Sequence, residues 1–320
     1  EEDDNFILGR NSFTWTSFAA RSHDVMVYVK VFEVNVRYST RPLKISILNL
    51  GTHNESFLVV RLYINGEQVF ADVVSLLNTS SLIEIEYDWM PLESGFANIT
   101  VLVEAIPGET WLIDNHFSTL TEVIDWFIEI DSDADFESQG WPGSGTEEDP
   151  YRIENLYMMS LASFSRCIII EDTSVYFIIQ NCTFTGEDIA DHSGITMWNV
   201  TNGQILNNTF THCKFGIWGR EVFSFVFANN TFKNCWKGFW MEMSLHNDVI
   251  QNVFESNDDA IWILRMNFTT FENNTLRFNI NGLFIDFRSN ETQVRWNTFI
   301  DNDQNAVDDG EFISSSKILV

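Results

Sequence analysis

The sequence predicts an all-β chain in which an immunoglobulin-like β-sandwich is followed by a right-handed parallel β-helix with a 22-residue repeat. One observation is a small residue that recurs every 22 positions, at Gly194, Gly216, Gly238, Ala260 and Gly282. The other is a series of short β-type runs between residues 25 and 123. We divide the chain into an N-terminal extension (1–24), the sandwich (25–125), a linker and β-helix cap (126–150) and the β-helix (151–320).

The first half contains about seven short runs that alternate apolar and polar residues, as strands with one buried face do. The clearest runs are 25–29, 43–47, 57–64, 82–87 and 97–103. Asn65-Gly66 follows one run directly and precedes Gln68-Val69-Phe70, which is a strong signal for a β-hairpin. The regular spacing of the runs favours an immunoglobulin-like sandwich.

Several segments of this half resemble the cell-adhesion-related domain found in bacteria. They are residues 45–51 (ISILNLG), 60–66 (VRLYING), 87–91 (YDWMP), 107–109 (PGE) and 114–115 (DN). The resemblance covers roughly residues 22–123. It implies a surface spacer or adhesion module, and the family has no catalytic residues to transfer.

The second half repeats one pattern, in which each small residue is followed by an apolar, a variable and an apolar residue. Eleven residues after the small residue comes another apolar residue, and then a motif of the type Asn208-Thr209-Phe210. Such a unit cannot bury its apolar face alone, but stacked units share one core. Parallel stacking places equivalent residues about 4.8 Å apart. We therefore expect an asparagine column that hydrogen-bonds along the axis and a phenylalanine column inside.

The entry to this half resembles the N-terminal edge of archaeal surface β-helix proteins, relatives of the periplasmic copper-centre accessory protein of nitrous oxide reduction. The resemblance rests on residues 130–136, 140–146 and 149–154, and extends over about 126–310. It implies a fold of the pectate-lyase-like superfamily, which includes lyases, hydrolases, adhesins and structural proteins. We expect no copper site, because Met197 and Met241 point inward and the six histidines do not cluster.

Composition indicates an extracellular or cell-surface protein. The net charge of −28 excludes nucleic acid as a partner, and no apolar run is long enough to span a membrane. The acidic start of the chain suits a protein whose signal peptide has been removed. Ten Asn-x-Ser/Thr motifs indicate glycosylation, although β-helix turns also favour Asn and Thr for structural reasons. They begin at Asn54, Asn78, Asn98, Asn181, Asn199, Asn207, Asn229, Asn267, Asn273 and Asn290.

Two of the four cysteines, Cys213 and Cys235, are one repeat apart. Adjacent coils would bring their Cα atoms to about 4.8 Å, within the range of a disulfide. Two interpretations stay open: a bridge formed during export, or a stack of two free, buried thiols.

An aromatic column is the first candidate binding surface. Strand alternation places it on the solvent face of the β-helix. Its members are Trp218, Trp240, Trp262 and Phe284, and Trp198 opens the neighbouring outward column. An exposed aromatic ladder usually marks an interface. We consider burial against another protein surface, stacking on a glycan, and simple surface exposure.

The neighbouring column continues with Arg220, Glu242, Leu264 and Asp286. Glu242 and Asp286 are two coils apart, about 9.6 Å, near the upper limit of about 9.5 Å for the carboxylates of inverting glycosidases. An ion pair between Arg220 and Glu242 is the structural alternative.

Two further acidic segments are weighed in the same way. Asp258-Asp259 resembles the paired-aspartate motif of β-helical pectin hydrolases, but the accompanying His-Gly and Arg-x-Lys segments are missing, so a polar turn is the alternative. The alternation of Asp131, Asp133 and Asp135 resembles a calcium loop in which Phe136 replaces the required glycine. We expect no cofactor, and calcium at these aspartates is the alternative.

Together these features predict a secreted cell-surface protein with a binding, adhesion or self-assembling role. The expected partners are other surface-protein subunits or glycans, and a homo-oligomer is one form this would take. The alternative is a polysaccharide-active enzyme, a glycoside hydrolase or lyase, that uses carboxylates on the β-helix flank.

Overall fold

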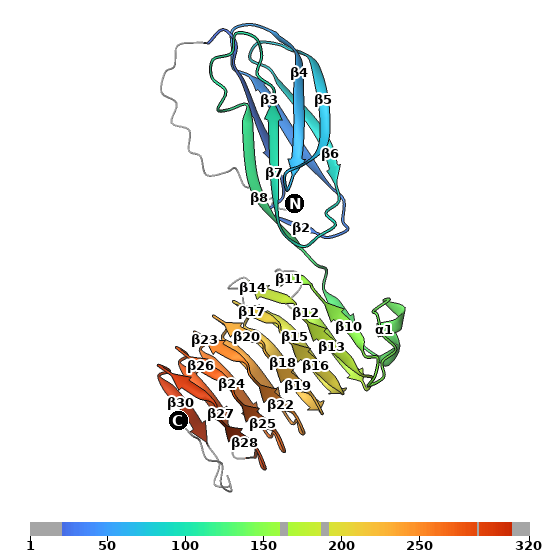
Figure 1. Cartoon of the computed structure of the whole chain (residues 1–320), viewed down its shortest axis with the longest axis vertical. Coiled ribbons are helices and arrows are strands. Elements are labelled where there is room, and N and C mark those ends of the chain that lie inside the picture. Colours follow the sequence, from blue (N-terminus) through green and yellow to red (C-terminus); the bar gives the residue numbers. More distant parts are fainter. Residues whose placement is uncertain (1–20, 161–165, 187–191, 287, 309–320) are drawn as a thin grey trace, which may run out of the picture. The chain divides into compact units, whose positions relative to one another are not determined.

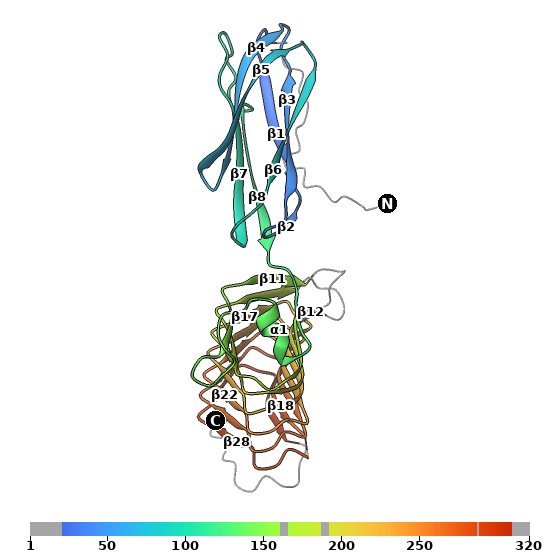
Figure 2. The same cartoon turned by 90° about the vertical axis from the view of Figure 1, so that its right-hand side faces the viewer.

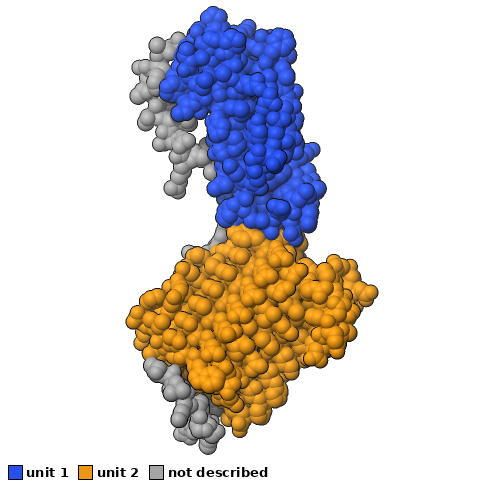
Figure 3. Space-filling view, in the orientation of Figure 1, with its two compact units in different colours: residues 1–124 blue, residues 125–320 orange. Residues whose placement is uncertain are grey.

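The computed structural model describes residues 21–160, 166–186, 192–286 and 288–308. Internal contacts divide the chain into two compact units, residues 1–124 and 125–320 (Figure 3). The all-β class is confirmed, since the described residues contain a single six-residue helix, α1 (Asp133–Ser138). No described helix is therefore able to cross a bilayer.

The first unit is a sandwich of two β-sheets (Figure 1). The smaller sheet has the order β1 (Val25–Lys30), β3 (Arg41–Asn49), β6 (Leu82–Trp89). The larger has the order β2 (Val34–Val36), β8 (His116–Ile124), β7 (Gly95–Val103), β4 (Glu55–Ile64), β5 (Glu67–Leu77). All pairings are antiparallel except that of β2 with β8. Inward residues such as Ile45, Leu62 and Ile99 are fully buried between the sheets.

The hairpin between β4 and β5 turns at Asn65-Gly66, as the sequence predicts. Both residues have positive φ, 50° at Asn65 and 86° at Gly66. Asparagine and glycine are the residues that adopt this conformation at low cost, so the pair fixes the position of the turn.

The second unit is a parallel solenoid with one strand per coil in each of three sheets (Figures 1 and 2). The eight-stranded sheet contains β9 (Ile128–Ile130), β12 (Arg166–Thr173), β15 (Ser193–Thr201), β18 (Phe215–Phe223), β21 (Lys237–Glu242), β24 (Asp259–Leu264), β27 (Asn281–Ile285) and β30 (Gln304–Asp308). It carries the candidate site described below.

Each of the other two sheets has seven strands. The first contains β10 (Tyr151–Glu154), β13 (Phe177–Gln180), β16 (Gly203–Leu206), β19 (Val226–Ala228), β22 (Asp248–Ile250), β25 (Thr270–Glu272) and β28 (Gln293–Arg295). The second contains β11 (Tyr157–Ser160), β14 (Thr183–Gly186), β17 (Thr209–Thr211), β20 (Thr231–Lys233), β23 (Val253–Glu255), β26 (Thr275–Arg277) and β29 (Thr298–Ile300).

The two expected internal columns are present. Phenylalanine rings stack along the axis with centroid separations of 4.8, 4.8 and 4.6 Å, through Phe184, Phe210, Phe232 and Phe254. The asparagine column runs through Asn208, Asn230, Asn252, Asn274 and Asn297. Each of the first four donates from Nδ2 to the Oδ1 of the next, at 2.9–3.1 Å. These buried amides satisfy one another and the backbone, which fixes the register of the coils.

In the coils of Gly194, Gly216 and Gly238 the glycine makes room for the phenylalanine stack, whereas a Cβ atom at Gly282 would lie 2.2 Å from the Asn305 carbonyl oxygen. A Cβ atom at Gly194 would lie 2.6 Å from Phe210, and one at Gly216 would lie 2.7 Å from Phe232. Ala260 replaces glycine in the coil where Leu276 takes the place of that phenylalanine. The single alanine in this column therefore accompanies the smaller side chain that packs against it.

Helix α1 belongs to the N-terminal end of the solenoid core. Phe136 is fully buried and stacks on Tyr151 at a centroid distance of 5.0 Å, with Phe177 at 5.2 Å. Because no strand precedes β10 in its sheet, Phe136 of the helix covers the Tyr151 ring instead.

Candidate binding site on the β-helix

The aromatic column lies on the outer face of the eight-stranded sheet. The strand register pairs Trp218 with Trp240, Trp240 with Trp262, and Trp262 with Phe284. All four are partly exposed, whereas the neighbouring Ile217 is fully buried. The column therefore points outward, as expected.

The rings of this column contact one another. The centroids of Trp218 and Trp240 are 6.1 Å apart, and those of Trp262 and Phe284 are 3.9 Å apart at an angle of 12°. Lys237 lies between the two pairs, with Nζ 3.8 Å from the Trp262 centroid and 5.7 Å from that of Trp240. These contacts cover part of the ring surface, and the four rings stay partly exposed. The column therefore forms a packed surface.

Lys237 and Asp259 form a buried ion pair on this sheet, with residue exposures of 6% and 7%. Asn281 Nδ2 also donates to Asp259 Oδ1 at 2.7 Å. Asp259 is thus committed to structural partners. Asp258 is exposed, and its amide donates to the carbonyl of Cys235 at 3.0 Å. The geometry favours the polar-turn interpretation of this pair.

Two tryptophans beside the column are more open to solvent. Trp198 is 41% exposed and Trp236 is 43% exposed. Arg220 lies over the Trp198 ring at 5.1 Å, and its Nε is 3.6 Å from Glu221. Arg220 pairs with Glu221 and not with Glu242, so that sequence-based expectation is wrong: the side chain turns along its own strand.

A cavity of about 330 Å³ lies where three strands leave the eight-stranded sheet. Glu242 ends β21, Leu264 ends β24, and Asp286 directly follows β27. The residues that line the cavity are Glu242, Met243, Leu264, Arg265, Asp286 and Arg288. Both carboxylates considered from the sequence therefore face one pocket, whose volume falls at the lower end of the range for small-molecule sites.

The charges in this pocket are incompletely paired. Asp286 Oδ1 accepts hydrogen bonds from the Arg265 amide and the Ser289 hydroxyl, both at 2.7 Å. Its Oδ2 has no partner among the described residues, and neither has the carboxylate of Glu242 or the guanidinium of Arg265. Unpaired groups of both signs in one pocket provide acceptors and donors for a polar ligand.

The sequence missed most of the pocket wall. Met243 and Arg265 occupy a corner of the coil and have positive φ, 49° and 53°. Neither residue type is typical of that conformation, so no local signal marks them. Trp236 was missed because its column has no recurring residue type: the equivalents are His192, Lys214, Asp258 and Ile280.

The aspartates of the expected calcium loop have structural partners. Asp133 accepts hydrogen bonds from the Ser174 amide at 2.7 Å and from its hydroxyl at 3.0 Å. Asp135 Oδ2 accepts from the Asp131 amide at 2.9 Å and from Ser132 Oγ at 3.0 Å. In the described parts of the chain, no cluster of three or more His, Cys, Asp or Glu side chains is suited to a metal ion. Calcium at this loop stays a prediction for a binding measurement.

The four cysteines are buried free thiols in the structure. The hydrogen bond with Cys235 and burial together raise the pKa of Cys213 well above its usual value. Burial raises the pKa of Cys167 and of Cys182 to about 12. None of these three is a reactive thiolate at neutral pH. Thiol counting under denaturation distinguishes the two interpretations of Cys213 and Cys235.

All ten predicted glycosylation asparagines are at least partly exposed. Four of them occupy one corner column with φ between 55° and 58°: Asn181, Asn207, Asn229 and Asn273. In three of these the following asparagine belongs to the internal ladder, and in all four the next threonine begins a strand. The corner itself thus favours an Asn-x-Thr pattern, whether or not a glycan is attached, although Gln251 and Trp296 adopt the same φ at equivalent corners.

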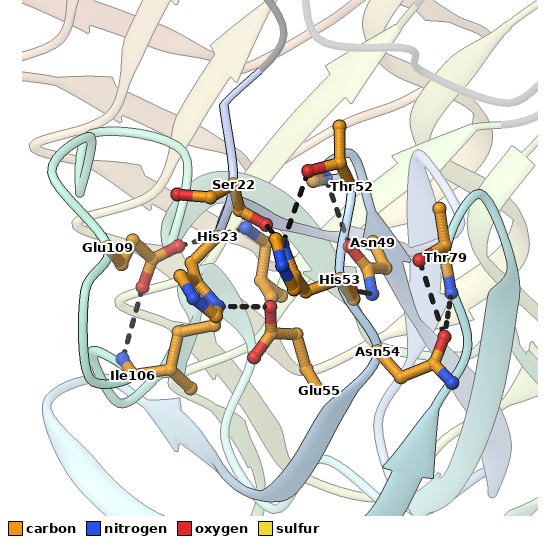
Figure 4. Close-up of polar contacts among 12 residues, drawn as sticks. Ser22, His23, Asn49, Thr52, His53, Asn54, Glu55, Thr79, Ile106 and Glu109 are labelled. Carbon is orange, nitrogen blue, oxygen red and sulfur yellow. Dashed lines mark hydrogen bonds and ion pairs between the residues drawn. The ribbon is translucent and has the colours of Figure 1, made fainter.

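A polar cluster at one end of the sandwich is the other candidate (Figure 4). His23 Nδ1 is 2.8 Å from Glu55 Oε1, and the His23 ring stacks on His53 at 5.0 Å. His53 Nδ1 lies 3.1 Å from the Ser22 carbonyl, which requires a proton on that nitrogen. These bonds tie the segment before β1 to the β3–β4 loop. We assign the cluster a structural role.

Comparison with known proteins supports this architecture. Residues 152–299 match the family model described as "Right handed beta helix region", which establishes this part as a right-handed β-helix of about seven turns. The CARDB domain of a Pyrococcus furiosus protein, solved with di-metal ions, is 20% identical over 34% of this chain and 95% of its own, with a TM-score of 0.32. The β-helix fold is thereby confirmed, and the sandwich fold is confirmed by the two sheets of the first unit. The archaeal and copper-centre kinship stays a prediction.

Two β-helical enzymes are also similar over most of the chain. The catalytic domain of a GH87 α-1,3-glucanase in complex with nigerose is 11% identical over 91% of this chain and 67% of its own, with a TM-score of 0.31. A family 28 exopolygalacturonase from Yersinia enterocolitica is 9% identical over 87% and 81%, with a TM-score of 0.24. Identities this low concern the fold alone. The sequence matches no curated protein.

Proposed function

We propose that this chain is an extracellular surface protein that binds carbohydrate, without cleaving it, in the pocket of the β-helix. The carrying observation is the set of unpaired groups there: Glu242, Asp286 Oδ2 and Arg265. Sugar hydroxyls both donate and accept hydrogen bonds, so they complement carboxylates and a guanidinium at the same time. Leu264 and Met243 supply apolar wall for the sugar's C–H groups.

The remaining features support a surface role. The adhesion-type sandwich fits a spacer that carries the β-helix, and all ten Asn-x-Ser/Thr asparagines are accessible to modification. Another subunit, including a second copy of the chain, stays the predicted partner of the tryptophan column. Trp198 and Trp236, which lie beside this column, are more exposed and would extend the contact surface.

A polysaccharide hydrolase is the second candidate, because two carboxylates line one pocket. The hydrogen bonds to Asp286 argue against it. One oxygen of this carboxylate holds the Arg265 amide and the Ser289 hydroxyl, which closes the turn after β27. A carboxylate that holds a turn through these hydrogen bonds is poorly placed to gain and lose a proton in each catalytic cycle.

Retention of the full chain on immobilised polysaccharides tests the proposal. We expect retention on at least one polymer, weakened about tenfold by Arg265→Ala, which removes one charge-assisted donor. Arg152→Ala is a matched control, because Arg152 is another partly exposed arginine and lies far along the solenoid axis from the pocket, in β10. The proposal fails if no polymer retains the protein, or if both variants lose retention equally. Release of reducing ends from a retained polymer would favour the hydrolase instead.

A further inference from the structure

We infer that the pocket selects a sugar that carries a free amino group. This inference rests on the proposed carbohydrate binding and names the class of glycan. The feature that points to it is the Asp286 side chain, whose residue is only 9% exposed and whose Oδ2 has no donor among the described residues, together with a second unpaired carboxylate in the same pocket.

Asp286 is the less exposed of the two carboxylate residues, at only 9%, and is therefore the main candidate for binding an amino group. Its Oδ1 is satisfied by two donors, while Oδ2 has none among the described residues. Oδ2 is not one of the buried atoms that lack a partner, so it is open to a donor from a ligand in the pocket. A neutral hydroxyl supplies one weak donor, whereas an ammonium supplies up to three donors and the compensating charge. An amino sugar therefore gains more at this oxygen than a neutral sugar does.

Glu242 offers a second carboxylate for an amino group, farther along the axis of the β-helix. It lies two coils from Asp286, about 9.6 Å of rise, with Leu264 between them. One sugar ring cannot place a single amino group on both carboxylates over that span. An oligosaccharide with several amino sugars can place one near each, and its C–H surface then covers Leu264.

The two arginines of the pocket should make it prefer such a glycan over a simple polyamine. Arg265 and Arg288 line the pocket, and the Arg265 guanidinium has no acceptor among the described residues. Guanidinium groups repel ammonium and donate to hydroxyl oxygens. The site therefore complements a ligand that carries amino and hydroxyl groups together.

The charge of the whole chain acts in the same direction. The sequence has 46 acidic residues against 18 Lys and Arg. Such a field raises the local concentration of cationic ligands and repels polyanions. We therefore expect acidic polysaccharides, such as polygalacturonate, to bind worst.

Isothermal titration of the full chain with two matched ligands tests the inference. The ligands are glucosamine and N-acetylglucosamine oligosaccharides of the same length, at a pH where the free amines are protonated. We expect the amino form to bind about tenfold more tightly or better, which is the effect of one charge-assisted contact. Asp286→Asn should abolish that preference while it keeps the Oδ1 acceptor for Arg265 and Ser289. Glu242→Gln, whose carboxylate has no hydrogen bond to the described residues, should reduce it independently.

The outcomes separate this inference from the proposed function. Equal affinity for both oligosaccharides overturns amino-sugar selection and leaves carbohydrate binding intact. A preference that survives in the Asp286→Asn, Glu242→Gln double variant also overturns it, because the amine would then be recognised elsewhere. Failure to bind either ligand or any immobilised polysaccharide overturns both proposals.

Discussion

At the scale of single residues, the glycine at position 216 is required by close contact with a phenylalanine ring and a backbone carbonyl. A Cβ atom at Gly216 would lie 2.7 Å from Phe232 and 2.5 Å from the Gly238 carbonyl oxygen. We expect Gly216→Ala to lower the free energy of unfolding of the β-helix by about 1–3 kcal/mol, the cost of overpacking. Urea denaturation followed by tryptophan fluorescence measures it. Ala260→Gly, opposite Leu276, is the control and should cost less than about 1 kcal/mol. Equal effects of the two changes would contradict this account.

Asp114 makes the sandwich sensitive to pH. Burial, followed by the charges of Asp24 and Glu109, raises the pKa of this carboxyl from 3.8 to about 6. The folded state thus binds the proton more tightly than the unfolded state. The contribution to stability is fully present below about pH 4, falls as the pH rises to about 6, and is absent above that value.

We therefore expect Asp114→Asn to stabilise the sandwich at pH 7 and to flatten its pH dependence between 4 and 6. Hydrogen exchange of the Val27 amide, which donates to the Asp114 carbonyl at 2.9 Å, reports on this site. Asp88→Asn, which removes an exposed carboxylate of the same sandwich, serves as the control. Protection that falls with pH equally in the variant and the natural chain would show that another group titrates.

At the scale of elements, the asparagine ladder holds the coils in register. Asn252 accepts from the Asn230 amide at 2.8 Å and donates to the Phe227 carbonyl at 2.9 Å. Asn252→Leu leaves these buried groups without partners, so we expect a loss of about 2–4 kcal/mol in the free energy of unfolding. Thermal unfolding monitored by circular dichroism measures it, with the exposed neighbour change Gln251→Ala as control. A loss of under about 1 kcal/mol would mean that water replaces the ladder.

The spacing of asparagines along the corner column limits how many of them can carry a glycan. Asn207 and Asn229 occupy equivalent positions in adjacent coils, about 4.8 Å apart. Two full glycans crowd each other at that spacing, so we expect partial or alternate occupancy there. Asn54, Asn78 and Asn98 lie on the sandwich and should be better occupied. Intact glycopeptide mass spectrometry of the natively produced protein checks this, and a peptide with both Asn207 and Asn229 fully modified would contradict it.

The same elements show how far the sequence predicts the structure. Register, core columns and outward columns follow from the 22-residue repeat, because parallel pairing fixes them once the period is known. The direction of individual side chains does not follow. The tryptophan rings close over the Lys237–Asp259 pair, and Arg265 reaches the pocket from a corner with positive φ. Both arrangements depend on neighbours that no repeat specifies.

At the scale of the whole molecule, two β-architectures are joined in one acidic chain, and the candidate site belongs to the β-helix alone. The sandwich contributes no residue to the pocket. We therefore expect the carbohydrate affinity of the full chain to be unchanged by Asp114→Asn, although that change stabilises the sandwich. Titration of both proteins with one bound oligosaccharide checks the independence of the two units. A shift in affinity of more than about threefold would contradict it.

The central claim is that carbohydrate binds in this pocket and stays intact. A crystal structure of the full chain grown with an excess of a glucosamine oligosaccharide tests it most directly. The account predicts density for an uncleaved oligosaccharide that contacts Arg265 and lies between Glu242 and Asp286. An oligosaccharide bound only along the tryptophan column, or density for a cleaved product beside Glu242 and Asp286, would contradict it.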